Sequence, residues 1–261
     1  MATVALDGKN LYRLMRDDGK QKLAVLYRSN AYGTSFAEAF IAAGQAEGVT
    51  VSRIAYADSD NPDYNAVRSA LVGRDAVAMV SYPGDGGILF NDYYKAGDDQ
   101  AINLNWYFAD SMADYAARMT DAEKPRFEKA KGVTQIMDSP YLEAFKEALK
   151  ARSQVDYSSG AEAAYDATML VALALVKGGV NQKEAVTQHL VDVSVGGTKQ
   201  EGWGQAGFQD AVAKIRSGTD FDYDGVSGAC DLDASGDRAD AKDIVWEWQD
   251  GKMVKTGPVM E

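Results

Sequence analysis

The sequence predicts an α/β fold built around a mostly parallel sheet. Between Lys22 and Arg152, short apolar runs alternate with segments that have helical spacing of apolar residues. The runs 22–27 and 75–82 are apolar on both faces, which is typical of strands that helices cover on both sides. Glycine follows several helical segments, such as Gly48 after the first, and commonly ends a helix. Strands and helices in strict alternation imply parallel strands joined by right-handed crossovers.

The expected elements follow one another in a regular order. Five strands are predicted at Lys22–Tyr27, Val49–Tyr56, Asp75–Tyr82, Ile102–Ala109 and Val133–Met137. Helices are predicted at Ser35–Glu47, Asp63–Val72, Ile88–Ala96, Ser111–Met119 and Pro140–Arg152. The first of these helices places Phe36, Phe40 and Ala43 on one face, as an amphipathic helix against a sheet requires.

The alternation of strand and helix patterns stops after Arg152. Helical patterns now follow one another at Ser159–Lys177, Gln182–Val193 and Phe208–Ile215, without intervening apolar runs. The tail 243–254 predicts a β-hairpin, because Asp250-Gly251 is a turn signal between two alternating segments. This second part therefore supplies helices and a hairpin but no series of parallel strands.

Charge and composition exclude several classes of partner. The 261 residues carry a formal net charge of −12, which repels nucleic acid and anionic membranes. No apolar run approaches the roughly 20 residues that span a bilayer, so membrane insertion is not expected. No basic region followed by an apolar one is visible at the N-terminus, so no signal peptide is recognised. The one cysteine, Cys230, has no partner for an internal disulfide.

Three polar loops are expected at the carboxyl ends of the strands, where ligands bind in open α/β sheets. Helix N-termini at this edge also offer free N–H groups. The candidate ligand-binding residues are Ser29, Asn30, Tyr32 and Gly33 in the first loop, Tyr82, Gly84 and Asp85 in the second, and Asp110 and Ser111 in the third. Plain helix capping by Ser, Thr or Asp is the competing interpretation of each loop. Capping does not require Tyr32 or Tyr82, so the aromatic side chains favour binding.

Signals for catalysis, cofactors and metals are weak. Neither a G-x-G-x-x-G nor a G-x-x-x-x-G-K-[ST] motif occurs, and His189 is the only histidine. We therefore expect no enzyme activity, no cofactor and no metal. The stretch from Asp220 to Asp231 resembles a calcium loop, but it lacks the Glu expected at the twelfth position. Turns between short strands are favoured there.

Four stretches, in order, carry a resemblance to a known family. They are Lys22–Gly33 with its Tyr-Gly loop, the Tyr-Asp-Ala helix at Ala164–Ala174, the Gly-Val-Ser-Gly segment at Phe221–Gly228 with the Asp231–Arg238 turn, and the hairpin Val245–Lys252. From Leu11 onward the chain resembles the type I periplasmic binding proteins, the Leu/Ile/Val-binding-like components of branched-chain amino-acid ABC transporters.

The resemblance implies a fold, a function and a partner. Family members have two Rossmann-like lobes that bind an amino acid or similar small polar solute between them. They are periplasmic or extracellular and deliver the solute to an ABC transporter permease. Carried over by position, Tyr32, the Tyr82–Asp85 segment and Asp110 with Ser111 line the ligand cleft. A ligand-sensing regulatory domain of the same fold is the alternative, and an α/β enzyme is a more distant one.

Departures from the family pattern set the expected domains. The parallel core that opens the first lobe has no counterpart, and Arg16–Gln21 is too short for the helix that normally precedes the Lys22 strand. We therefore expect residues 1–21 to be a remnant of the first lobe and its crossover. Residues 22–152 would form a complete Rossmann-like ligand-binding lobe, and residues 153–261 an incomplete second lobe of helices with a hairpin. A truncated chain of this kind would bind ligand weakly and expose apolar surface on the helix at 159–177.

Overall fold

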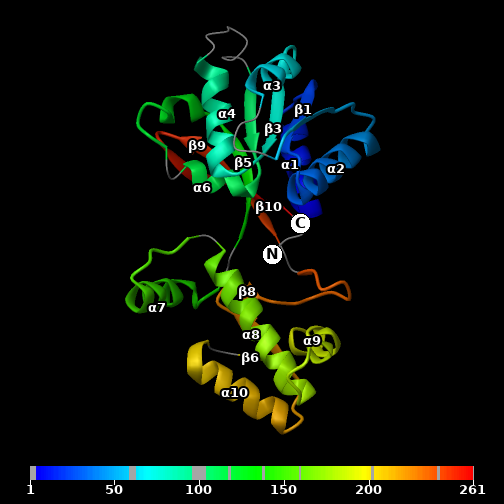
Figure 1. Cartoon of the computed structure of the whole chain (residues 1–261), viewed down its shortest axis with the longest axis vertical. Coiled ribbons are helices and arrows are strands. Elements are labelled where there is room, and N and C mark those ends of the chain that lie inside the picture. The colour runs from blue at the N-terminus through cyan, green and yellow to red at the C-terminus, as the bar shows by residue number, and fades with distance from the viewer. Residues whose placement is uncertain are drawn as a thin grey trace. The chain divides into compact units, whose positions relative to one another are not determined.

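The computed structural model describes residues 4–58, 63–95, 104–116, 119–136, 139–158, 160–200, 203–239 and 242–260. The chain divides into two compact units, and Figure 1 traces its course through each. We call residues 3–135 with 242–261 the sheet unit, and residues 136–241 the helical unit. The predicted boundaries at Ala96, Ile102, Met137 and Ser159 lie outside the described residues.

The sheet unit is built on a seven-stranded sheet with the order β10-β9-β5-β4-β3-β1-β2. Its strands are β1 (Leu23–Arg28), β2 (Ser52–Tyr56), β3 (Ala76–Val80), β4 (Asn105–Phe108), β5 (Lys131–Gln135), β9 (Asp243–Gln249) and β10 (Lys252–Met260). The first five are parallel, whereas β9 runs antiparallel to β5 and β10 antiparallel to β9. The predicted α/β class and the five parallel strands are confirmed.

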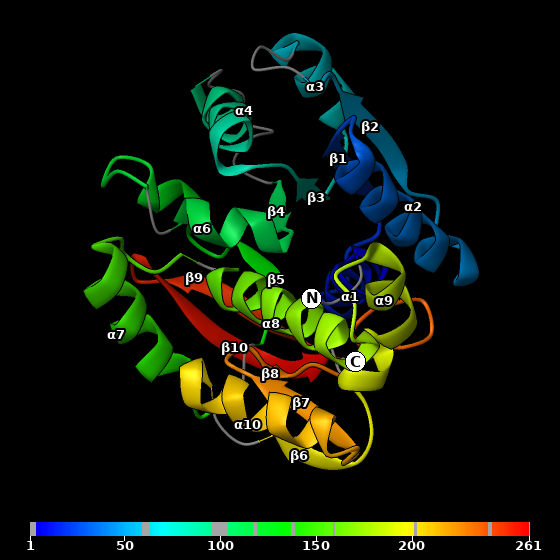
Figure 2. The ribbon, with the colours of Figure 1, turned by 60° about the horizontal axis from the view of Figure 1, so that its bottom comes forward.

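Helices cover both faces of this sheet (Figure 2). They are α1 (Val4–Asp17), α2 (Ala31–Ala46), α3 (Tyr64–Leu71), α4 (Pro83–Lys95), the short η1 (Asp110–Met112), α6 (Ala113–Ala116) and η2 (Lys124–Phe127). Val25 of β1 belongs to the apolar cluster that contains α1 and α2 residues, while its neighbour Leu26 belongs to the cluster with α3 and α4. This two-sided burial explains why β1 is apolar at consecutive positions.

The N-terminal residues correct one expectation. Residues 4–17 form a 14-residue helix, α1, that packs on α2 and belongs to the sheet unit. They are therefore not a crossover remnant, and a helix does precede the β1 strand. Leu11, Tyr12 and Met15 are buried along its inner face. The helix was missed because it begins upstream at Val4, rather than after the Leu11–Leu14 segment.

The C-terminal hairpin corrects a second expectation. It was grouped with residues 153–261, but β9 pairs with β5, and the units divide after Gln135 and before Lys242. Trp246 stacks on Phe108 of β4, with ring centroids 6.2 Å apart. The turn is as predicted, because Asp250 and Gly251 both have positive φ, as a tight hairpin turn requires. Pairing between strands this distant in sequence leaves no local pattern.

The helical unit contains the three predicted helices after Arg152. Its elements are α7 (Leu142–Ser153), α8 (Ala161–Gly178), α9 (Lys183–His189), η3 (Val191–Val193), α10 (Gly204–Arg216) and the strands β6 (Thr198–Gln200), β7 (Phe221–Gly225) and β8 (Gly228–Ala229). The short parallel pair of β6 and β7 was not predicted. Leu170 and Leu173 of α8 pack with Phe221 and Tyr223 of β7 in one core.

No single helix in the described part of the chain has the length and apolar character to cross a membrane. Taken together, α8 and α9 reach that length and apolar character, by length and composition only, but the pair is bent by 100°.

Candidate ligand-binding edge

The candidate residues lie where β1, β3 and β4 end, but several belong to helices rather than loops. The Asn30 side chain caps α2 by accepting a hydrogen bond from the Gly33 N–H at 2.9 Å. Tyr32 and Gly33 therefore stand in the first turn of α2. Likewise α4 begins at Pro83, a favoured first helical residue, and its first turn contains Gly84 and Asp85. At this edge, helix capping therefore occurs beside the candidate binding side chains, so the two interpretations do not exclude each other.

Tyr32 joins the first predicted segment to the third. Its hydroxyl donates to Asp110 Oδ1 at 2.6 Å and lies 3.2 Å from Ser111 Oγ. Burial, with the nearby Asp110 carboxylate, raises the pKa of the Tyr32 phenol well above its usual value. The phenol therefore stays neutral and acts as a fixed donor to Asp110.

Tyr82 is the exposed aromatic group of the edge, with 38 % of its surface accessible. Its ring lies 5.8 Å from the Tyr32 ring, and its hydroxyl accepts from Asn30 Nδ2 at 3.3 Å. The guanidinium of Arg28 stands 5.5 Å from the centre of the Tyr82 ring, in cation–π range. Tyr82 is therefore held by its neighbours while part of its aromatic ring remains exposed to solvent.

Asp85 is turned inward. It is 6 % exposed, accepts from the Tyr56 hydroxyl at 2.6 Å and lies 3.4 Å from Arg28 Nη1. Arg28 also forms an ion pair with Asp58. Burial and the Asp85 carboxylate raise the pKa of Tyr56, so this phenol too remains a neutral donor. Asp85 thus positions Arg28 and Tyr56 from beneath the edge.

The remaining predicted residues have simpler surroundings. Ser29 is exposed, and its backbone N–H donates to the Tyr56 carbonyl at 2.9 Å. Gly33 is required by packing, because a Cβ there would collide with the carbonyl oxygen of Arg28. Gly84 is exposed and open, with nothing near the position of an added Cβ. All nine candidates therefore lie at one edge, and Tyr32, Tyr82, Asp110 and Ser111 form its side-chain cluster.

Three residues that contact the candidates at this edge, Arg28, Tyr56 and Ser81, were not among the sequence candidates. Ser81 accepts at its carbonyl from Ser111 Oγ at 2.5 Å, and its own hydroxyl contacts Tyr56. Arg28 and Ser81 lie inside the predicted loops but were not chosen. Tyr56 ends β2, so its place at a strand carboxyl end was a signal that could have identified it.

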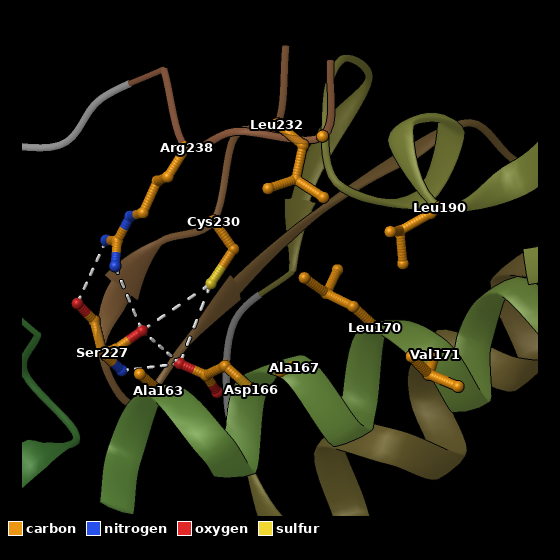
Figure 3. Close-up of a pocket in the computed structure, with 11 residues that line it drawn as sticks. Ala163, Asp166, Ala167, Leu170, Val171, Leu190, Ser227, Cys230, Leu232 and Arg238 are labelled. Atoms are coloured by element: carbon orange, nitrogen blue, oxygen red, sulfur yellow. Dashed lines mark hydrogen bonds between the residues drawn. The ribbon is translucent and has the colours of Figure 1, made fainter. Parts of the chain in front are cut away.

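The helical unit has a separate cavity of about 250 Å³ beside α8, shown in Figure 3. One end is apolar, with Leu170, Val171, Leu190 and Leu232, and the other gathers Asp166, Ser227, Cys230 and Arg238. Val171, at the apolar end, is 39 % exposed. Burial raises the pKa of the Cys230 thiol to about 12, so the thiol stays protonated and is a poor nucleophile.

Asp166 organises the polar end of this cavity. It is 2 % exposed and accepts from Tyr223 Oη at 2.9 Å, from the N–H groups of Val226 and Ser227 at 3.1 and 2.7 Å, and from Ser227 Oγ at 2.6 Å. These contacts fix the Gly-Val-Ser-Gly turn against α8. The carboxylate therefore serves a structural role.

The aspartate-rich stretch forms two short strands, β7 and β8, joined by a turn, as expected from the sequence. Residues 221–225 form the strand β7, which is incompatible with the geometry of a calcium-binding loop. Within the described residues, no group of three or more His, Cys, Asp or Glu side chains has the arrangement to hold a metal ion.

Comparison with known proteins assigns the chain to a family. A family model described as the receptor family ligand binding region matches residues 4–251. The chain belongs to this receptor ligand-binding family. A relative, the Leu/Ile/Val-binding protein homolog 3 of Brucella melitensis, is 25 % identical over 264 residues. That match covers 94 % of this chain and 63 % of the relative, so the chain spans less than two thirds of its length.

Solved structures support the type I periplasmic binding protein fold of this receptor ligand-binding chain. A leucine binding protein from Thermotoga maritima matches with a TM-score of 0.71 at 15 % identity, covering 98 % of this chain and 65 % of that one. A putative branched-chain amino acid ABC transporter protein from Rhodospirillum rubrum gives 0.64 at 17 %, covering 98 % and 66 %. A solute binding protein from R. palustris, in complex with benzoate, gives 0.63 at 16 %, covering 97 % and 62 %.

Proposed function

We propose that this chain is the ligand-binding part of an ABC transporter substrate-binding protein and takes an amino acid or similar small polar solute. The observation that carries the proposal is the convergence of Tyr32, Tyr82, Asp110 and Ser111 at one sheet edge. These residues come from three separate segments, and hydrogen bonds or ring contacts join them. Membership of a ligand-binding family supports reading this convergence as a binding surface.

The chemistry of the edge suits a solute with a positively charged group. Among the described residues of this edge, the carboxylates of Asp58, Asp85 and Asp110 accompany the guanidinium of Arg28. Asp85 and Asp58 are paired with Arg28, which leaves Asp110 as the group to receive an ammonium. The exposed Tyr82 ring offers a cation–π and apolar contact for the rest of the solute.

The proposed role is binding rather than catalysis. The two buried phenols of the edge, Tyr32 and Tyr56, hold their protons because their pKa values are raised. No nucleophile with an adjacent base stands among the described residues of the cluster. Delivery to a membrane permease, in the periplasm or outside the cell, belongs to the same proposal and is supported by relatives named as ABC transporter proteins.

Isothermal titration calorimetry with leucine, isoleucine, valine and other amino acids tests the proposal, with benzoate included because one relative was solved with it. We expect weak but saturable binding of an amino acid, with Kd above about 1 μM, because the described edge contacts a ligand from one side. Tyr82→Ala should weaken that binding about fivefold, since loss of an aromatic contact costs roughly 1 kcal/mol.

The matched control is Tyr157→Ala, which removes a partly exposed tyrosine of the helical unit. Binding by this variant should equal that of the unaltered chain. No heat with any solute at millimolar concentration, or equal affinity in the two tyrosine variants, would contradict the proposed site. Sub-micromolar affinity would contradict the expectation of a one-sided contact.

A further inference from the structure

Two aspartates are buried together where the chain leaves and re-enters the sheet unit. Asp7 lies in the first turn of α1, and Asp243 is the first residue of β9. They are 2 % and 0 % exposed. Asp243 pairs with Gln135, the last residue of the unit before the chain departs, and Lys242 is the first on its return. The pair therefore joins α1 to the base of both connecting segments.

The partners of these carboxyls are too few for two negative charges. Asn10 Nδ2 donates to Asp243 Oδ2 at 2.9 Å, and the Gln135 side chain hydrogen-bonds to Asp7. The two carboxyls also hydrogen-bond to each other. The Oδ1 atom of each is buried and receives no N–H or O–H donor from the described residues. Two ionised carboxylates are both acceptors, so contact between them requires a proton.

The surrounding groups favour retention of that proton. Asp110 of η1 acts on both carboxyls with like charge, and Tyr32 of α2 is a neutral phenol. Arg13 of α1 reaches Asn10 Oδ1 at 3.4 Å, on the far side of the amide from the pair. Lys242, which precedes Asp243, is exposed. The charge of the described residues that acts on both carboxyls is therefore the negative one of Asp110.

We propose that Asp7 and Asp243 share one proton at neutral pH and act as a pH-sensitive clasp that fastens α1 to both connecting segments. Burial and the neighbouring carboxylates raise the pKa of Asp7 to about 9. Loss of the proton would place two buried negative charges in contact, beside Asp110. Alkaline conditions would therefore release the start of α1 from β5 and β9.

Infrared spectroscopy of the whole chain tests the shared proton directly. At pH 8 ordinary carboxyls are ionised, and so is Asp222, whose pKa is raised only to about 6. We expect a carbonyl stretch of a protonated carboxyl at pH 8 that disappears on titration above pH 9. It should also be absent from Asp7→Asn, in which an amide replaces the protonated carboxyl, and present in Asp17→Asn on the exposed end of α1.

Denaturant unfolding across pH gives a second readout. The folded chain keeps a proton that the unfolded chain releases near pH 4, so stability falls as pH rises between these limits. The folding equilibrium constant relative to Asp7→Asn should drop about tenfold per pH unit from pH 5 to 8 and level off above pH 9. A constant ratio, or no protonated carboxyl band at pH 8, would overturn the proposal. If Asp7→Asn fails to fold, the infrared titration of the unaltered chain decides alone.

Discussion

Two buried aspartates, Asp166 of the helical unit and Asp7 of the sheet unit, have opposite surroundings. In the helical unit, four N–H and O–H groups surround Asp166. In the sheet unit, Asp7 meets another carboxyl, Asp243, and the further donors among the described residues are side-chain amides. Donors that stabilise the anion allow a buried charge to persist, whereas a carboxyl pair without them is stable only with a proton. Burial alone therefore does not predict the charge state of an aspartate.

The same comparison distinguishes the structural aspartates from the one that we propose receives a ligand. Asp166 is fully engaged in fixing a turn, and Asp85 is engaged with Tyr56 and Arg28. Asp110 is partly exposed, and Tyr32 and Ser111 hold it at the sheet edge. A carboxylate positioned by neighbours but still accessible is the one suited to receive a solute.

The largest expected loss of stability comes from removing the Asp166 carboxylate, which accepts four hydrogen bonds. Asp166→Ala leaves the N–H groups of Val226 and Ser227 and the Tyr223 hydroxyl buried without an acceptor. We expect a loss of about 3–5 kcal/mol in the unfolding free energy of the helical unit. Fluorescence of Trp203, the tryptophan of this unit, against denaturant concentration measures it.

Asp210→Ala is the matched control for this change. Asp210 lies in the same unit, with its side chain 53 % exposed and paired with Lys214. A surface pair contributes about 0–1 kcal/mol, so this variant should unfold close to the unaltered chain. Equal losses in the two variants would show that the donors around Asp166 contribute little.

A smaller change in stability, dependent on pH, is expected from Asp222 of the helical unit. Asp222 is 7 % exposed, and its Oδ1 has no donor among the described residues. Burial, then Asp231 and Asp224, raise the pKa of Asp222 to about 6. Because the folded pKa exceeds the unfolded value near 4, stability falls as pH rises between pH 4 and 6. The folding equilibrium constant should drop by up to about tenfold per pH unit.

Replacing this charge should remove the dependence. Asp222→Asn should flatten the stability profile of the helical unit between pH 4 and 6, measured by Trp203 fluorescence at each pH. Asp220→Asn, at an exposed position just before β7, should keep the profile of the unaltered chain. Parallel profiles for all three proteins would mean that Asp222 is ionised throughout this range.

The fold was predictable where local pattern and burial agree. The strands β1 and β3 are covered on both faces, so their consecutive apolar residues are all buried and form runs that can be recognised in the sequence. The helix α1 was missed because its start at Val4 precedes the segment read as a crossover. The hairpin was misplaced because its partner, β5, is distant in sequence. Its position depends on tertiary contacts, the ladder between β9 and β5 and the stacking of Trp246 on Phe108.

The candidate edge was predictable from topology more than from motif. The rule that parallel strands end at one edge selected Tyr32, Tyr82 and Asp110. Applied to β2, the same rule would have added Tyr56. Sequence could not show that Asp85 points inward, because its contacts with Tyr56 and Arg28 depend on how α4 packs. Nor could it pair Asp7 with Asp243, since opposite ends of the chain supply them.

The central claim is that the edge formed by Tyr32, Tyr82, Asp110 and Ser111 binds the solute. A nuclear magnetic resonance titration of the isotope-labelled chain with the amino acid that binds in calorimetry tests it most directly. The account predicts saturable shifts of the backbone amides of Tyr82, Asp110 and Ser111, which disappear in Asp110→Asn. Shifts confined to residues lining the α8 cavity, such as Val171 and Leu232, with this edge unmoved, would contradict it.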